Sequence, residues 1–205
     1  MTIFSISEAL RFGWRITKKN FAVIAKIIIV SALVFVVPSL LMQIFKYFPF
    51  LSFLISVVSL YLQLRISIAL LRIAIRFVDG QPVALDDLWF APSFRLLSRY
   101  VVGAVLFSLI VFAGSILLVI PGIIWTVKYQ FFGYLIVDKG MTASDALKKS
   151  GQMTAGLKWQ LFLLGVIMWV VNFLGAMILG IGLVVTIPAT MIAHAYVYKK
   201  LAEHN

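Results

Sequence analysis

Six long apolar stretches dominate this sequence, at about residues 21–45, 50–77, 100–120, 122–137, 159–179 and 183–200. A helix needs about 20 predominantly apolar residues to cross the hydrocarbon core of a bilayer. Of the 205 residues, 63% are hydrophobic and only 12% are charged, and a soluble domain could not bury that much apolar surface. The sequence therefore predicts an all-α polytopic membrane protein with about six transmembrane helices, forming one integral membrane domain over residues 1–205.

Short segments rich in Pro and Gly divide these runs into three hairpins. The expected turns are Lys46-Tyr47-Phe48-Pro49, Pro121-Gly122 and Gly180-Ile181-Gly182. An arrangement of four helices would need two spans of about 38 to 42 residues, or about 57–63 Å, which is roughly twice the hydrocarbon thickness. Six spans in three hairpins are therefore expected.

Lys and Arg residues gather on one side of these expected hairpins. They precede the first span, occupy the two longer loops and follow the last span, whereas the opposite side carries only Lys46. Because cytoplasmic loops are enriched in basic residues, we expect both termini in the cytoplasm of a multi-pass protein in a bacterial cytoplasmic (inner) membrane. The run 21–45 is longer than the core of a signal peptide, which favours a retained first span.

Three segments before the hairpins have the pattern of amphipathic interfacial helices, at about 5–20, 84–98 and 143–157. In the first and the third, basic residues share one helical face, and apolar or small residues share another. The basic residues expected to face anionic headgroups are Arg11, Arg15, Lys18, Lys19, Lys148 and Lys149. The net charge of +11 fits contact with membrane lipids better than binding of nucleic acid.

The first and third of these segments also match each other at an offset of 137 residues. Ser5 to Arg11 aligns with Thr142 to Lys148, and Thr17 aligns with Thr154. Both segments begin with a hydroxyl side chain that is followed three residues later by an acid, which is the pattern of a capping box. The match indicates either duplication of a unit made of a helix and a hairpin, or the shared requirements of any surface helix.

The stretch from Pro121 to Leu201 carries the motifs of a known family. These are Pro121-Gly122-Ile123-Ile124, Tyr134-Leu135-Ile136-Val137-Asp138, Ala146-Leu147-Lys148-Lys149-Ser150, Met153-Thr154-Ala155-Gly156 and Lys158-Trp159-Gln160-Leu161-Phe162. With them the chain resembles a family of bacterial six-helix integral membrane proteins of unknown function. It is also similar to the membrane domain of glycerophosphoryl diester phosphodiesterases. The resemblance implies a helical membrane architecture, because the phosphodiesterase chemistry of those proteins belongs to a separate soluble domain.

No group of residues has a pattern typical of catalysis or metal binding. The chain has no cysteine and two histidines, and we expect one of them, His194, to bond to a neighbouring helix. All seven acidic residues fall at expected helix ends or loops, whereas cation-coupled transporters often rely on carboxylates at membrane depth. We therefore expect no enzymatic activity, no cofactor and no metal site.

Two cations fall inside expected spans, Arg65 in the second and Lys128 in the fourth. A charge at the bilayer centre costs from about 2.5 kcal/mol upward and commonly marks a functional site. With no acid to pair with, the two side chains could bind an anion or a lipid phosphate. Alternatively, each could extend along the helix to reach the membrane surface.

Two functions are compatible with these features. The first is a non-enzymatic membrane module that organises anionic lipids or a partner membrane protein. The alternative is a transporter or channel for an anionic or lipid-like substrate that uses Arg65 and Lys128. No pattern specifies an oligomeric state, and an intramembrane enzyme would need several titratable side chains at depth, which the sequence lacks.

Overall fold

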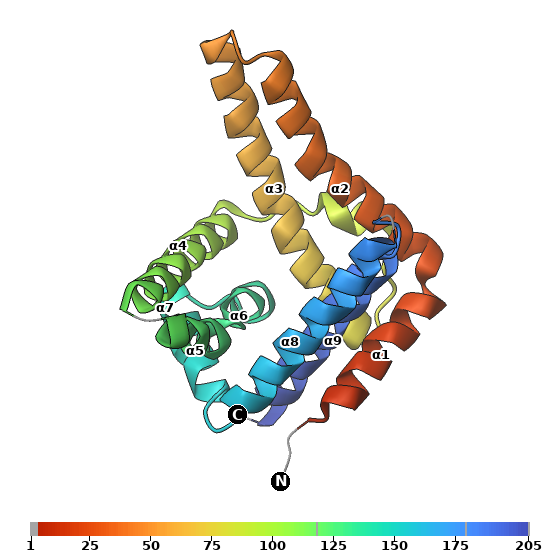
Figure 1. Cartoon of the computed structure of the whole chain (residues 1–205), viewed down its shortest axis with the longest axis vertical. Coiled ribbons are helices and arrows are strands. Elements are labelled where there is room, and N and C mark those ends of the chain that lie inside the picture. Colours follow the sequence, from red (N-terminus) through yellow and green to blue (C-terminus); the bar gives the residue numbers. More distant parts are fainter. Residues whose placement is uncertain (1–3, 118, 179, 205) are drawn as a thin grey trace.

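The computed structural model describes residues 4–117, 119–178 and 180–204, and within those ranges the chain contains helices and no strands (Figure 1). The elements are α1 (Ile6–Lys19), α2 (Phe21–Ile44), α3 (Pro49–Val78), the 3-10 helix η1 (Leu85–Trp89), α4 (Phe94–Leu117), α5 (Val119–Tyr129), α6 (Phe132–Lys139), α7 (Ala143–Met153), α8 (Lys158–Met177) and α9 (Leu183–His204). Five helical segments of the described chain are long and apolar enough to cross a membrane: Phe21–Ile44, Pro49–Val78, Phe94–Ile116, Val119–Lys139 and Lys158–Met177. The protein is therefore all-α, with the composition of a polytopic membrane protein.

Three helix pairs form arms that diverge from a common base (Figure 1). The pairs are α2 with α3, α4 with α5, and α8 with α9, and each is packed side by side. The first arm turns at 45–48, as predicted, and Pro49 begins α3 where a missing N–H costs no hydrogen bond. The third arm turns at the predicted glycines, where Gly180 has a φ of +74°. The arms point in different directions, so the protein is not a parallel six-helix bundle.

Each segment that precedes an arm packs against the arm before it in the chain. η1 packs on α3, and α7 packs on α4, α5 and α6. α1, the first described helix, packs on α9, the last one. At this crossing a Cβ on Gly13 would overlap the carbonyl oxygen of Ala189, so the two backbones are in direct contact. The α1–α9 contact therefore closes the three units of segment and arm into a ring.

The small and apolar faces of α1 and α7 are buried in protein. α1 buries Ala9, Gly13 and Thr17, and it does so mainly against α9. α7 buries Ala146 and Leu147 together with other residues of the face that the sequence indicates. An interfacial helix would instead place its apolar face among lipids. The expectation of interfacial helices is corrected in this respect, because these faces carry small side chains that pack closely against neighbouring helices.

The prediction of a middle helix over 84–98 is wrong. Within this range Leu85–Trp89 forms a short 3-10 helix, and α4 begins at Phe94 after an irregular stretch that contains Pro92. A proline inside a helix removes a hydrogen bond and clashes with the preceding turn. Asp87 accepts a hydrogen bond from the N–H of Ala84 at 2.8 Å and pairs with Arg76, which fastens η1 to α3.

The fourth predicted span, 122–137, lies within the candidate span Val119–Lys139, in which the helix has a short break. α5 ends at Tyr129 and α6 begins at Phe132, so the segment breaks at Gln130 and Phe131. Pro121-Gly122 was expected to form the turn but lies inside α5, because a helix accepts proline in its first turn. Together α5 and α6 form the 21 residues of this candidate span.

α9 is packed among four other helices. It contacts α1, α2, α3 and α8, and Ile192, Ala193 and Val197 are fully buried. The sixth predicted span, 183–200, corresponds to this helix, but α9 is not among the five candidate spans. Its second half carries His194, two tyrosines and two lysines, which lower its mean hydropathy. The count of five against about six expected therefore reflects the polar second half of α9.

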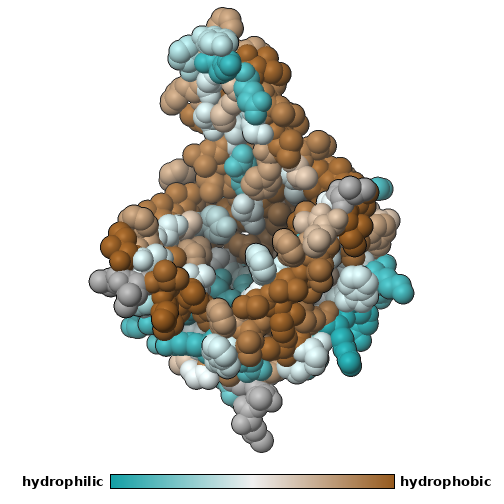
Figure 2. Space-filling model, viewed as in Figure 1, coloured by the Kyte–Doolittle hydropathy of each residue, from teal (hydrophilic) through white to brown (hydrophobic). Residues whose placement is uncertain are grey.

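The surface separates apolar arms from polar edges (Figure 2). Large apolar side chains are exposed on all three arms, among them Phe50, Phe112 and Trp169. Polar residues gather along the lower edges of this view, at the tip of the first arm and in a hollow between the arms (Figure 2). This distribution suits a chain whose arms are surrounded by lipid.

Candidate anion-binding site

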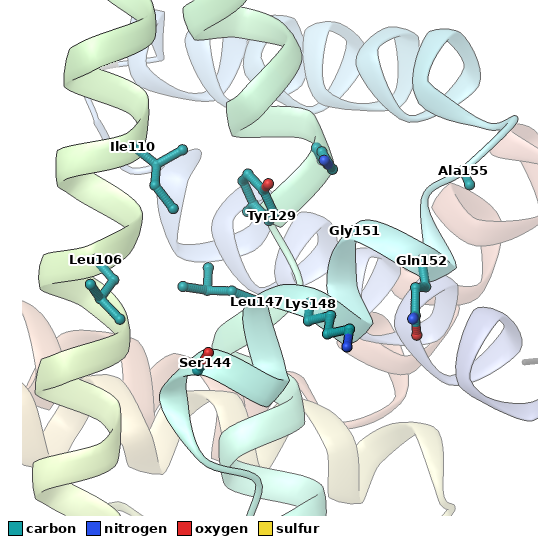
Figure 3. Close-up of a pocket in the computed structure, with 10 residues that line it drawn as sticks. Leu106, Ile110, Tyr129, Ser144, Leu147, Lys148, Gly151, Gln152 and Ala155 are labelled. Carbon is teal, nitrogen blue, oxygen red and sulfur yellow. The ribbon is translucent and has the colours of Figure 1, made fainter.

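A pocket of about 680 Å³ opens between α4, α5 and α7 (Figure 3). Its lining residues are Leu106, Ile110, Lys128, Tyr129, Ser144, Leu147, Lys148, Gly151, Gln152 and Ala155. Leu106 and Ile110 form an apolar wall on α4, while Lys148 and Gln152 project from α7 on the other side (Figure 3). The lining combines amino, hydroxyl, amide and apolar groups without a carboxylate, and the volume is in the range of small-ligand sites.

The break between α5 and α6 positions Lys128 in this pocket. The hydroxyls of Ser150 and Thr154 lie 3.1 Å and 3.0 Å from the carbonyl oxygen of Lys128. The Ser150 hydroxyl also accepts a hydrogen bond from the N–H of Phe131 at 3.2 Å. These backbone groups lose their helical partners at the break, and α7 replaces them. A Cβ on Gly151 would lie 3.0 Å from Cε of Lys128, so the lysine side chain runs directly over the α7 backbone.

The two lysines of the pocket have no acidic partner in the described chain. Each ion pair among those residues involves Arg76, Lys139 or Lys199, and neither pocket lysine. The Nζ of half-buried Lys128 lies 5.0 Å from the ring centroid of Tyr129, which is a cation–π contact. Lys148 is exposed on α7. The pocket therefore carries two positive charges that an anion could neutralise.

Arg65 has a different environment. Its Nη2 donates to the carbonyl oxygens of Trp89 at 2.9 Å and Phe90 at 3.4 Å, at the end of η1. The guanidinium also lies 5.7 Å from the ring centroid of Tyr61. Arg65 does not line the pocket that contains Lys128. The structure thus brings Lys128 together with Lys148, and it brings Arg65 to backbone carbonyls.

The basic residues predicted to face headgroups lie mainly on the outer surface. Arg11, Arg15, Lys18 and Lys19 are all exposed on α1, on the face opposite the buried residues. Trp14 lies among them and is 54% exposed. On α7, Lys148 is exposed and Lys149 is half-buried. The outward face of α1 therefore presents four cations and an indole ring.

One buried polar network was not predicted in full. His194 of α9 lies with Nε2 at 2.8 Å from Oε1 of Gln130 and with Nδ1 at 3.3 Å from the hydroxyl of Tyr134. Gln130 Nε2 donates to the carbonyl of Val127 at 2.9 Å, so its oxygen faces His194, and we assign the ring proton to Nε2. The expectation that His194 bonds to a neighbouring helix is confirmed. Nothing in the sequence marked Gln130 and Tyr134 as partners of His194, because they lie 64 and 60 residues away.

A second polar cluster joins the C-terminal ends of three helices. Lys199 Nζ lies 3.1 Å from Oδ2 of Asp79 and 3.2 Å from Oδ1 of Asp138, and the Tyr198 hydroxyl donates to Asp138 at 2.8 Å. Burial acts to lower the pKa of Lys199, but the hydrogen bonds and charges of the two carboxylates outweigh it and raise the pKa above its ordinary value. The cluster connects α3, α6 and α9. In the part of the chain that the structure describes, no three His, Cys, Asp or Glu side chains come close enough to hold a metal ion.

Comparison with known proteins places the chain in a family. The family model described as "Protein of unknown function (DUF975)" matches residues 1–205, which is the whole chain. The chain belongs to the DUF975 family. The predicted membership in a family of unknown function is thereby confirmed, and no solved structure matches this DUF975 protein.

Two curated relatives of this DUF975 protein are mycobacterial. They are the uncharacterized protein Rv2560 of Mycobacterium tuberculosis (strain ATCC 25618 / H37Rv) and the uncharacterized protein Mb2590 of Mycobacterium bovis (strain ATCC BAA-935 / AF2122/97). Each is 31% identical over 130 residues, which is 60% of this chain and 37% of the relative. The chain thus matches little more than a third of their length. Neither name mentions a phosphodiesterase, so the likeness to that membrane domain stays a prediction.

Proposed function

We propose that this DUF975 protein is a non-enzymatic membrane module that binds anionic lipid headgroups around its base. One observation carries the proposal: α1 buries its small residues against α9 and turns Arg11, Arg15, Lys18 and Lys19 outward. Because the helix is held by protein, its charges stay in place at the surface of the ring. A cation close to an anionic membrane surface contributes about 1 kcal/mol to the attraction.

The position of α1 in the chain supports contact with headgroups. α1 ends at Lys19, and α2, a candidate span, begins at Phe21. In the same way α7 is followed closely by α8, which begins at Lys158 beside the exposed Trp159. Lysine and tryptophan at the end of a span are typical of the membrane interface. We extend the proposal to a bacterial inner membrane with both termini, α1 and α7 on the cytoplasmic side.

The predicted likeness to the membrane domain of glycerophosphoryl diester phosphodiesterases would fit this role. The transport alternative, with Arg65 and Lys128 in one path, has less support because Arg65 is bound to two backbone carbonyls. A partner membrane protein with an acidic surface could bind the same four cations, and the experiment below separates it from lipid.

The test compares lipids around the purified, reconstituted protein. Spin-labelled phosphatidylglycerol and phosphatidylcholine would be added in turn, and electron paramagnetic resonance would measure the fraction of each held at the protein surface. We expect phosphatidylglycerol to be preferred by about fivefold. The variant with Arg11, Arg15, Lys18 and Lys19 changed to Glu should lose most of that preference.

The matched control is Lys46→Glu, at the opposite end of α2. It should keep the preference, because it changes charge at the tip of the first arm and leaves α1 intact. Equal retention of both lipids by the wild-type protein would contradict the proposal. The same result, combined with loss of a copurifying protein in the α1 variant, would assign the basic face to a protein partner instead.

A further inference from the structure

We propose that the pocket between α4, α5 and α7 binds a lipid whose headgroup ends in a phosphate monoester. This inference rests on the proposed function and names a lipid class for one site. The surface of α1 would attract anionic lipids in general. The pocket would hold one of them by a defined set of side chains.

The charge of the pocket favours a dianion. Lys128 enters from the α5 side and Lys148 from α7, and no carboxylate lines the space between them. A phosphate monoester carries about −1.5 to −2 charges at pH 7, whereas a phosphodiester carries one. Two ammonium groups are therefore neutralised by one monoester. A phosphodiester would leave about one positive charge uncompensated.

The neutral polar groups of the pocket are available to a ligand. The side chains of Tyr129, Ser144 and Gln152 line it, and none of them has a side-chain hydrogen bond within the described residues. Together they supply two hydroxyls and one amide, which can donate to phosphate oxygens. Hydrogen bonds between such donors and an ionised phosphate are stronger than those between neutral groups.

The apolar wall indicates that the phosphate belongs to a lipid. Leu106 and Ile110 of α4 line the side of the pocket opposite Lys148 (Figure 3). α4 is a candidate span, and its neighbouring residues Val105 and Leu109 are more than half exposed. A hydrocarbon chain could therefore leave the pocket along α4 into the bilayer. A free phosphate ion would make no use of this wall and would fill only a small part of the 680 Å³.

The break at Gln130 and Phe131 explains why the site exists at all. A continuous helix from α5 through α6 would need no partners from α7 for its backbone. Because the helix breaks, Ser150 and Thr154 bind the Lys128 carbonyl and hold α7 beside α5. The same contact sets Lys148 and Lys128 at one pocket. In the sequence Lys128 is a lone lysine in an apolar run. In the structure, the break in that run holds α7 nearby and so brings Lys148 to the same pocket.

The experiment titrates the purified full chain in detergent with lipids of equal acyl chains and follows bound lipid by native mass spectrometry. The probes are phosphatidic acid, which has a phosphate monoester, and phosphatidylglycerol and phosphatidylcholine. We expect one phosphatidic acid to bind about tenfold more tightly than phosphatidylglycerol. Lys128→Gln and Lys148→Gln should each remove most of this difference. Lys149→Gln, the neighbouring lysine that does not line the pocket, should retain it.

Three other outcomes of this experiment would count against a site for a lipid phosphate monoester. Equal affinity for phosphatidic acid and phosphatidylglycerol, with both above phosphatidylcholine, would overturn this inference and leave the proposed function standing. Unchanged affinity in the Lys148→Gln variant would also overturn it, since this exposed side chain can be changed without loss of folding. Displacement of phosphatidic acid by millimolar inorganic phosphate would overturn the assignment to a lipid, because it would show that the site recognises the free ion. Lys128→Arg keeps the charge and should keep the preference, which separates loss of binding from loss of fold.

Discussion

The hydroxyl of Ser150 lies 3.1 Å from the carbonyl oxygen of Lys128, and this contact fastens α7 to the break between α5 and α6. Because Ser150 also accepts from the N–H of Phe131, its loss leaves that buried donor without a partner. We expect Ser150→Ala to lower the free energy of unfolding by about 1–3 kcal/mol. Thermal unfolding in a mild detergent, followed by circular dichroism, would measure it. Ser144→Ala, on the exposed side of the same helix, should be neutral, and an equal effect of both changes would contradict the role given to Ser150.

Gly13 sets the distance between α1 and α9. A methyl group there would overlap the carbonyl oxygen of Ala189, so Gly13→Ala should force the helices apart and cost about 1–3 kcal/mol. Limited trypsin digestion should then cut α1 faster at its exposed basic residues. Gly165→Ala is the control, because a Cβ at that position of α8 meets nothing within 4 Å. Unchanged digestion of the Gly13 variant would mean that the ring does not depend on this contact.

Lys199 joins α9 to the carboxylates of Asp79 and Asp138. Its side chain is 18% exposed, so Lys199→Met should leave the carboxylate of Asp138, which is 14% exposed, facing the more exposed carboxylate of Asp79, and it should cost about 1–3 kcal/mol. Lys200→Met, at an exposed neighbouring position, should change the free energy of unfolding by less than about 0.5 kcal/mol. Chemical denaturation monitored by tryptophan fluorescence would compare them. If the two variants unfold alike, the cluster contributes nothing to stability.

His194 and Gln130 should be coupled. Their contact of 2.8 Å lies inside the ring, and either single change to an apolar residue leaves a polar partner unpaired. A double-mutant cycle with His194→Phe and Gln130→Leu should show an interaction energy of about 0.5–3 kcal/mol, with the double variant more stable than the sum of the single effects predicts. Thermal unfolding of all four proteins would measure this. Strict additivity would show that the two side chains are independent.

The proposed orientation can be tested by cysteine labelling, because the chain has no native cysteine. Tyr47, at the tip of the first arm, is 80% exposed, and Ser144 on α7 is exposed as well. On intact spheroplasts a membrane-impermeant maleimide should label Tyr47→Cys and spare Ser144→Cys. After lysis both should react. Labelling of Ser144→Cys alone on intact spheroplasts would place α7 and the pocket outside the cytoplasm.

Local sequence signals predicted a turn correctly where only one local structure was compatible with the signal. Pro49 and Gly180 mark turns because the chain on both sides is apolar and helical. Pro121-Gly122 failed as a turn signal, since the first turn of a helix accepts the same pair. Segment 84–98 is not one helix, because an irregular stretch that contains Pro92 separates η1 from α4. The periodicity of 143–157 correctly indicated the buried face of α7, including Ala146 and Ser150.

The residues of the candidate site could likewise be predicted only in part. Arg65 and Lys128 gave the same signal in the sequence, a cation in an apolar run, yet one binds carbonyls at the end of η1 and the other lines a pocket. Nothing near Arg65 in the sequence shows that Trp89 will supply its partner, 24 residues later. Lys148 was predicted as a surface charge, and its place beside Lys128 depends on the contact between α7 and α5.

The sequence alone determined the composition of the arms, most of their turns and the basic face of α1, because these follow from local hydropathy and helical period. Only the tertiary structure decided that α9 is packed among four other helices, that α1 closes the ring, and that Lys128 shares a pocket with Lys148. Those features depend on contacts between residues far apart in the chain, such as Gly13 with Ala189 and Ser150 with Lys128. No local pattern encodes such contacts, since they arise only when the helices pack and each broken backbone group finds a partner.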